Sequence, residues 1–289
     1  VNDWFADAAR PLPWREPSTS PWGVLVSEVM AQQTPVARVV EPWRAWLRRW
    51  PGPADLAASP AREAVAAWGR LGYPRRALRL HGAATAIVEH HGGRVPAGLD
   101  ELRALPGIGE YTAAAVASFA FGARAGVLDT NVRRVLTRLD RGRQYPANST
   151  TAAERRMAAR WLPDDAATAS RWAASSMELG ALVCTATAPG CAGCPVAGHC
   201  RWSATGRPAH EGPPRRRQAY AGTDRQARGR LLEQLRSHEA GVEVLLPRFD
   251  LPGSTTPAGS AGGGVMRRGV PATRLPDGRL VTTVYDLLL

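Results

Sequence analysis

The sequence predicts an all-α fold for roughly the first 200 residues, on three observations. Apolar residues recur at intervals of three and four in one segment after another, as in helices that bury one face. Short stretches containing Gly and Pro separate these segments, as expected for turns between helices. The alternation of apolar and polar residues that is typical of exposed strands does not occur before Cys200.

The helices follow in chain order from these patterns and from their end signals. Residues 22–32 (WGVLVSEVMAQ) and 42–50 carry apolar side chains at helical spacing. Ser59 and Pro60 fit the cap and the first turn of another helix. Further helices are predicted at residues 76–90, 99–105, 110–121, 130–139, 151–161 and 166–183.

The last part of the chain differs in composition. Residues 211–217 (EGPPRRR) read as a linker, residues 223–238 could form one more helix, and residues 248–278 are rich in Gly, Pro and Ser. The closing residues 279–289 (RLVTTVYDLLL) could form a strand. A small appended module and a disordered tail both fit this composition.

The net charge of the chain indicates more about its function than its length does. The 289 residues, 44% of them apolar, are enough for about two domains with a core. They carry 37 basic against 25 acidic residues, a net charge of +12, which favours nucleic acid as partner. Every basic residue of this count is arginine, because the chain contains no lysine. We find no signal-peptide pattern and no apolar run long enough for a membrane span, so we expect a cytoplasmic protein.

Four cysteines lie within 17 residues, with the spacing C-x6-C-x2-C-x5-C. Without an export signal, such a cluster favours a metal centre over disulfides. Four thiolates fit zinc or an iron–sulfur cluster, and the single C-x2-C pair favours [4Fe–4S]. We expect the centre to act mainly as a structural clamp, and we expect His199 to lie at the surface. The ligands are Cys184, Cys191, Cys194 and Cys200.

The segment LPGIG, from Leu105 to Gly109, precedes a predicted helix and forms a helix–hairpin–helix signature. Gly107 and Gly109 permit a turn whose backbone N–H groups can bind a phosphate oxygen at a helix N-terminus. Such contacts position DNA without reading its sequence. An ordinary turn between two helices is the alternative.

Two carboxylates stand out. Asp129 directly precedes the helix at 130–139, where it fits an N-cap and where a fixed, ionised carboxylate could stabilise a cation. Glu28 lies on the apolar helix at 22–32, and burial there would raise its pKa enough for a general acid. Its polar neighbours favour the alternative, an exposed Glu28.

Together these motifs resemble the adenine DNA glycosylases of the MutY family. The resemblance runs from about residue 3 to about residue 204 and rests on five features in order. It implies a six-helix barrel domain at 20–126 and an iron–sulfur domain formed by 1–19 and 127–205. Residues 206–289 would be a linker and short tail module, without a recognisable Nudix-like domain. The features are SEVMAQQT (27–34), LGY (71–73), LPGIGEYTAAAV (105–116), LDTNVRRV (128–135) and the four-cysteine loop.

The resemblance also implies a reaction, the removal of adenine opposite 8-oxoguanine or guanine in double-stranded DNA by base flipping. Glu28 would protonate adenine at N7, and Asp129 would stabilise the oxocarbenium ion at C1′. The remaining implied roles are assistance near the sugar for Tyr111 and Asn131, lining of the adenine pocket for Arg15, wedging into the base stack for Gln32 and Tyr73, and DNA contact for Gln33, Leu105, Gly107 and Gly109.

The absence of lysine distinguishes between branches of this superfamily. Bifunctional members attack C1′ with a lysine amine at the position of Tyr111 and then cleave the strand. We therefore expect a monofunctional, water-using glycosylase. The alternatives are an endonuclease III-like glycosylase with lyase activity and a non-catalytic iron–sulfur DNA-binding module. The chain differs from the family pattern at Pro74, where the family usually has a second aromatic residue.

We expect a monomer in the cytoplasm, associated with the nucleoid. A sliding clamp could be a protein partner, although no motif in the sequence indicates one.

Overall fold

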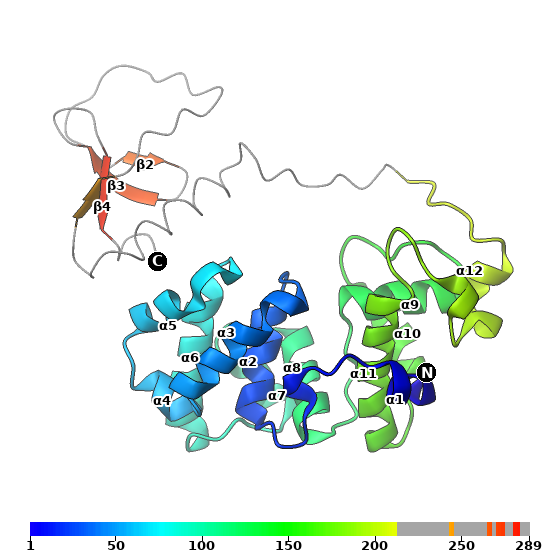
Figure 1. Ribbon diagram of the computed structural model, residues 1–289, viewed down its shortest axis with the longest axis horizontal. Helices are drawn as coiled ribbons and strands as arrows, with labels where there is room; N and C mark the ends of the chain where they lie inside the picture. The colour runs from blue at the N-terminus through cyan, green and yellow to red at the C-terminus, as the bar shows by residue number, and fades with distance from the viewer. Residues whose placement is uncertain (213–242, 246–264, 268–269, 275–279, 284–289) are drawn as a thin grey trace. The chain divides into compact units, whose positions relative to one another are not determined.

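A computed structural model describes residues 1–212 and four short strands at 243–245, 265–267, 270–274 and 280–283 (Figure 1). The chain divides into two compact units. The first comprises Val1–Pro60 and Arg76–Gly212, and the second comprises Ala61–Arg75 and residues 213–289. The domain boundaries expected from the sequence stay a prediction.

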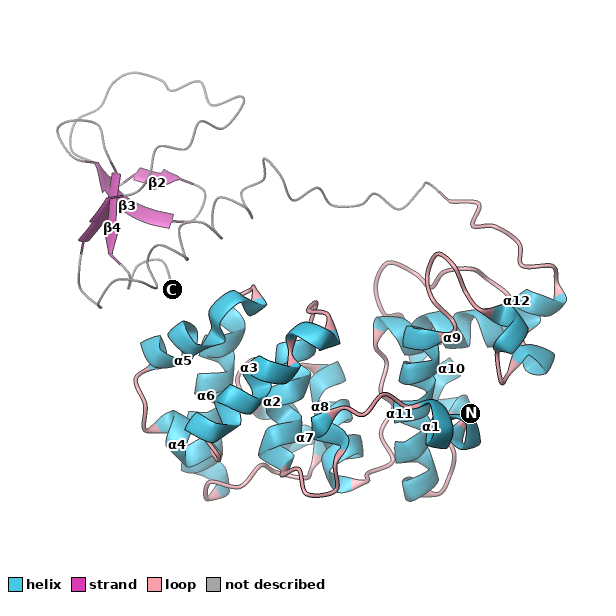
Figure 2. Cartoon of the chain, viewed as in Figure 1, coloured by secondary structure: helices cyan, strands magenta, loops and turns pink. Residues whose placement is uncertain are grey.

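All regular structure within residues 1–212 is helical, as predicted (Figure 2). The longer helices coincide with the segments that have a clear helical period. None of the described helices combines the length and the apolar character needed to cross a membrane. The helices that correspond to predicted segments are α2 (Pro21–Ala31), α3 (Val40–Arg49), α5 (Ala61–Trp68), α6 (Arg75–His91), α7 (Leu99–Ala104), α8 (Glu110–Phe121), α9 (Thr130–Arg141), α10 (Ala152–Trp161) and α11 (Ala166–Leu182).

Three short helices, of four to seven residues, were not predicted, whereas the six-residue α7 was. Fewer than two turns leave few positions in which a helical period can be recognised. The three helices are α1 (Asn2–Ala8), α4 (Pro53–Ala57) and α12 (Arg201–Ala204), with 3₁₀ turns at Pro13–Arg15, Val36–Arg38, Gly69–Leu71, Cys191–Gly193 and Ala197–His199.

Two helix pairs organise the first unit. The apolar helix α2 packs against α8, and α9 packs against α11. Two buried indole N–H groups in this part of the core have backbone partners: Trp22 donates to the carbonyl of Trp50 at 3.0 Å, and Trp43 donates to that of Gly23 at 2.8 Å. A Cβ at Gly23 would lie 2.9 Å from Thr19 and 3.2 Å from Leu47, so glycine permits this close packing. The two pairs place the ends of α2, α8 and α9 within one unit.

The second unit contains α5, the Gly69–Leu71 turn and the strands. These strands are β1 (Glu243–Leu245), β2 (Val265–Arg267), β3 (Val270–Arg274) and β4 (Leu280–Thr283), in one antiparallel sheet of order β1-β4-β3-β2. β4 confirms the strand expected near the C-terminus. The other three, at three to five residues, are too short for a recognisable alternation. The helix expected at residues 223–238 lies outside the described residues.

Candidate active site

Glu28 lies on α2, a helix buried on nearly all sides. The Ser20 hydroxyl caps its start by accepting a 3.2 Å hydrogen bond from the backbone of Gly23, and Pro21 occupies the first turn. Nine of its 11 residues are buried, and Glu28 itself is only 8% exposed. The exposed position that its polar neighbours favoured is therefore wrong. The polar residues of this helix do not define a solvent-facing side.

The Glu28 carboxyl group faces a tyrosine hydroxyl and a second acid. Tyr111, at the start of α8, donates a 2.8 Å hydrogen bond to Oε2 of Glu28. Burial raises the pKa of Glu28 from 4.5 to about 7; the Tyr111 hydrogen bond and the charge of Arg15 act against this rise, whereas the charge of Asp129 adds to it. Burial also holds the pKa of Tyr111 well above its usual value, so this phenol stays a hydrogen-bond donor. Glu28 can thus hold or release a proton near neutrality.

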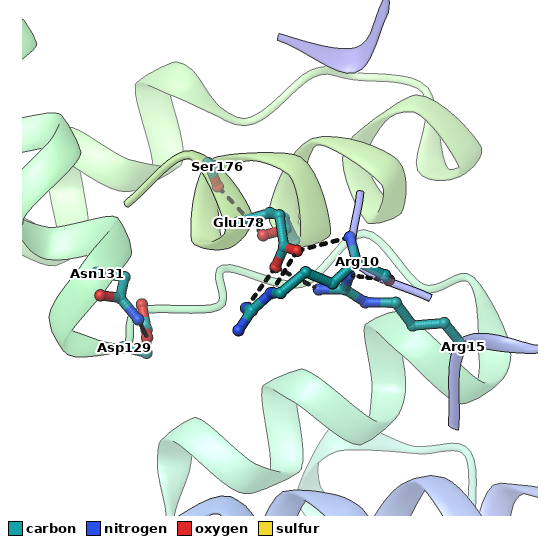
Figure 3. A network of polar contacts seen from close by, with 7 residues as sticks. Arg10, Arg15, Asp129, Asn131, Ser176 and Glu178 are labelled. Carbon is teal, nitrogen blue, oxygen red and sulfur yellow. Dashed lines mark hydrogen bonds and ion pairs between the residues drawn. The ribbon is translucent and has the colours of Figure 1, made fainter. Parts of the chain in front are cut away.

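Asp129 is the N-cap of α9, as the sequence predicted. Its Oδ1 accepts a hydrogen bond from the backbone of Val132 at 2.6 Å, and its Oδ2 accepts one from the Asn131 amide at 2.8 Å (Figure 3). Burial raises the pKa of Asp129, while these hydrogen bonds and Arg134 lower it, and the net shift is upward. The cap hydrogen bonds therefore favour the ionised carboxylate, as expected from the sequence, but burial opposes them and has the larger effect. The bonds nevertheless fix both carboxylate oxygens.

Asn131 connects Asp129 to an arginine on the same helix. Its Oδ1 accepts a 2.7 Å hydrogen bond from Arg134, which also donates to the carbonyls of Gly180 and Cys184 at 2.7 Å each. A side chain at Gly180 would collide with Asn131, because its Cβ would lie 2.7 Å from that of Asn131. The glycine on α11 therefore allows the close approach that fixes the start of α9.

An ion-pair network that sequence reasoning missed ties the N-terminal segment to α11. Glu178 is fully buried and accepts hydrogen bonds from the Arg10 backbone at 2.9 Å and side chain at 2.7 and 2.8 Å, and from Arg15 at 2.9 Å (Figure 3). Burial opposes its charge, but the bonds from Arg10 and Arg15 lower the pKa of Glu178 to about 2. No motif links these residues, which lie more than 160 positions apart.

The QQT segment ends α2. The Gln32 amide donates to the hydroxyl of Thr112 on α8 at 3.1 Å, whereas Gln33 is exposed and has a left-handed backbone with φ of 54°. In the second unit, Tyr73 is 39% exposed and has φ of 50°. Left-handed backbones are uncommon for residues other than glycine and concentrate at functional sites.

The predicted hairpin joins α7 to α8. Gly107 has φ of 74°, and a Cβ there would lie 2.5 Å from the Arg79 side chain, so only glycine fits. Gly109 is the N-cap of α8 and is exposed, with no side chain to cover the helix end. The Leu105 side chain is 4% exposed and belongs to the core. The glycines, and not this leucine side chain, form the accessible part of the turn.

The four cysteines, Cys184, Cys191, Cys194 and Cys200, line one small cavity next to α9 and α11 and form no disulfide. Apolar residues pack against three of them. Arg138, on α9, donates to the Cys184 sulfur at 3.2 Å and lies over the Trp202 ring at 4.5 Å. Among the described residues, no three His, Cys, Asp or Glu side chains are arranged to hold a single metal ion. His199 is exposed, as expected.

Known proteins resemble this chain in sequence and in fold. Residues 26–163 match the family model of the HhH-GPD superfamily base excision DNA repair proteins. The adenine DNA glycosylase of Mycobacterium tuberculosis (strain CDC 1551 / Oshkosh) is 50% identical over 239 residues, which cover 83% of this chain and 78% of the relative. That of Mycolicibacterium smegmatis is 52% identical over 239 residues, covering 83% and 80%.

A solved non-covalent endonuclease III–DNA complex is similar in structure, with a TM-score of 0.59 and 26% identity over 70% of this chain and 91% of the other. The chain belongs to the adenine DNA glycosylases, enzymes of base excision repair within the HhH-GPD superfamily.

Proposed function

We propose that this chain is a monofunctional glycosylase that hydrolyses the N-glycosidic bond of adenine mispaired with 8-oxoguanine or guanine in duplex DNA. One observation carries the proposal: Glu28, a buried glutamic acid with a pKa near neutrality, shares a site with Asp129, which caps the start of α9. Glu28 has a pKa of about 7, and the charge of Asp129 acts on it. A pair of carboxyl groups in different environments is the usual arrangement for cleaving a glycosidic bond.

Glu28 supplies the proton. With a pKa raised to about 7 by burial, Glu28 can carry this proton at neutral pH. Transfer to N7 makes adenine a neutral leaving group, and the C1′–N9 bond breaks with its electron pair going to the base. The hydroxyl of Tyr111 holds Oε2 in place and cannot readily accept the proton itself.

Asp129 stabilises the cation that remains on the sugar. The amide of Asn131 and the backbone of Val132 hold its oxygens before the reaction, so little reorganisation is needed when charge develops at C1′. Water then adds to C1′ and loses a proton to the Glu28 carboxylate, which restores the acid. Because the chain has no lysine, a lysine Schiff base and the strand cleavage that follows it are not available.

DNA is held without sequence reading and the adenine is flipped out of the duplex. The exposed turn at Gly107 and Gly109 offers backbone N–H groups to phosphate oxygens. Arg15, held by Glu178, lines the adenine pocket. Gln32 and Gln33 contact the stack from which the base leaves. Tyr73, in the second unit, is a further residue to which we assign contact with DNA.

The cysteines hold a [4Fe–4S] cluster. All four line a common cavity next to α9 and α11, and four cysteine thiolates are the ligand set that an iron–sulfur cluster uses. A cluster held there would cross-link residues 184–200 to α9 and α11, which line the same cavity. Its ligands are Cys184, Cys191, Cys194 and Cys200.

A single-turnover assay tests the proposal. Short duplexes carry adenine opposite 8-oxoguanine, guanine or thymine, and products are analysed with and without hot alkali. We expect adenine release opposite 8-oxoguanine and guanine, with strand breaks only after alkali. Strand breaks without alkali would indicate a lyase. No release from any duplex, by protein with its metal centre intact, would indicate a binding module.

A further inference from the structure

The turn that follows α2 is an unusual piece of backbone. Gln33 takes a left-handed conformation, with φ of 54°, although it is not a glycine, an asparagine or an aspartate. Such a conformation costs of order 1 kcal/mol and persists only where surrounding contacts impose it. The neighbours on either side differ from it in exposure. Gln32 is half-buried and bonded to Thr112, and Thr34 is buried at 7% exposure, whereas Gln33 is exposed.

A buried guanidinium imposes this conformation. Arg76, near the start of α6, is only 6% exposed. Its NH1 donates to the carbonyls of Val29 and Met30 at 2.9 Å each and to that of Gln32 at 2.6 Å. These carbonyls belong to the last turn and the end of α2, where helices leave acceptors unsatisfied and carry partial negative charge.

The same guanidinium also holds the far side of the turn, because its NH2 donates to the hydroxyl of Thr34 at 3.0 Å. Arg76 thus bonds the residues immediately before and immediately after Gln33. With both neighbours held, the connecting residue has little freedom, and its side chain is the one left at the surface. A lysine could not replace this planar fork, since an ammonium group acts as a single compact donor centre.

We propose that Arg76 is a positioning residue for base excision, which acts by holding the turn that presents Gln33 to the base stack. The proposal rests on the proposed function above, because it gives the turn a role only if adenine is extruded from DNA. Arg76 itself touches no reacting atom. Its effect should therefore appear in the extrusion step and should pass through Gln33.

A double-mutant cycle tests this. Duplexes carry 2-aminopurine opposite 8-oxoguanine, and the fluorescence rise on unstacking reports the extrusion rate at saturating protein. We expect Arg76→Lys to slow extrusion about tenfold in the parent chain and less than twofold in the Gln33→Ala background, because coupled residues do not act additively. An equal fold-loss in both backgrounds would overturn the proposal, since Arg76 would then act elsewhere.

A matched control separates positioning from general stability. Arg133 is also buried and donates at 2.8 Å to two carbonyls, those of Ala147 and Ser149. Arg133→Lys should lower the melting temperature as Arg76→Lys does, without changing the extrusion rate by more than twofold. Equal slowing by both variants would contradict a specific role for Arg76.

If Arg76→Lys fails to fold, Thr34→Val replaces it in the same cycle. This variant removes the hydroxyl that accepts from Arg76 and donates to the Gln32 carbonyl at 3.3 Å, and it leaves Arg76 in place. It should slow extrusion about threefold in the parent chain and not in the Gln33→Ala background. Equal slowing in both would again overturn the proposal. Failure of the proposed function looks different: the parent chain itself would release no adenine.

Discussion

The hydroxyl of Tyr111 donates a 2.8 Å hydrogen bond to Oε2 of Glu28, and this bond joins the first turn of α8 to the buried helix α2. A hydrogen bond to a carboxylate favours its charged form, so it lowers the pKa of Glu28, which burial has raised to about 7. The pair therefore sets how much of the acid carries its proton at neutral pH.

Replacing Tyr111 with Phe should increase the share of Glu28 that is protonated at neutral pH. Without the hydrogen bond, the pKa of Glu28 should rise above 7, since the bond now lowers it. The alkaline limb of the rate–pH profile for adenine release should shift to higher pH, as measured in single turnover across the neutral range. An unshifted or downward-shifted limb would contradict the role given to this bond.

Asp129→Asn should remove charge stabilisation while keeping the helix cap, because Asn caps helices as well as Asp does. We expect base release to slow by at least about 100-fold, with duplex affinity and melting temperature nearly unchanged. Asp165→Asn is the matched control: Asp165 caps α11 by accepting from Thr168 at 2.7 Å and is exposed. Equal losses in both variants, or no loss in the first, would contradict the assigned role.

Glu178→Gln should destabilise the protein in a pH-dependent way. The pKa of Glu178 is depressed from 4.5 to about 2, so its contribution is complete above pH 4.5 and is lost as pH falls through 2. We expect roughly 3 kcal/mol lower unfolding free energy at pH 7 and a narrowing difference in acid, measured by denaturant unfolding. Glu110→Gln, in an exposed pair with Arg155, should change little. A difference that is independent of pH would contradict this account.

Cys194→Ser should abolish the visible absorbance of an iron–sulfur cluster. A colourless parent protein that contains stoichiometric zinc would instead show that the metal is the other candidate. Metal analysis beside the absorption spectrum distinguishes the two results, because zinc has no visible charge-transfer bands and no redox chemistry.

Most of the helical unit could be predicted from the sequence because its helices are long and carry local end signals. Asp129 before α9 and the glycine turn before α8 are examples, since each element's start depends on residues within one turn of it. Of the described strands near the C-terminus, β4 lies in the segment that was expected to allow a strand, whereas β1, β2 and β3 gave no such signal. Their length of three to five residues leaves too few positions for an alternation.

The site depended on contacts that a sequence does not display. Glu28 is buried because α2 is covered on all sides, whereas a helix pattern assumes one exposed face. The pairing of Arg10 with Glu178 joins residues 168 positions apart, and no spacing rule connects them. Nothing in the sequence distinguishes Arg76 from the other arginines, because its carbonyl partners at the end of α2 are more than 40 positions away.

In the proposed reaction, Glu28 delivers the proton that releases adenine. The single-turnover rate of adenine release opposite 8-oxoguanine as a function of pH, measured for the parent chain and for Glu28→Gln, tests this role. The parent rate should fall as pH rises through about 7, where Glu28 loses its proton, and the variant should be slow and flat. A parent rate that is constant through neutrality, or a variant that keeps the parent rate and profile, would contradict the claim.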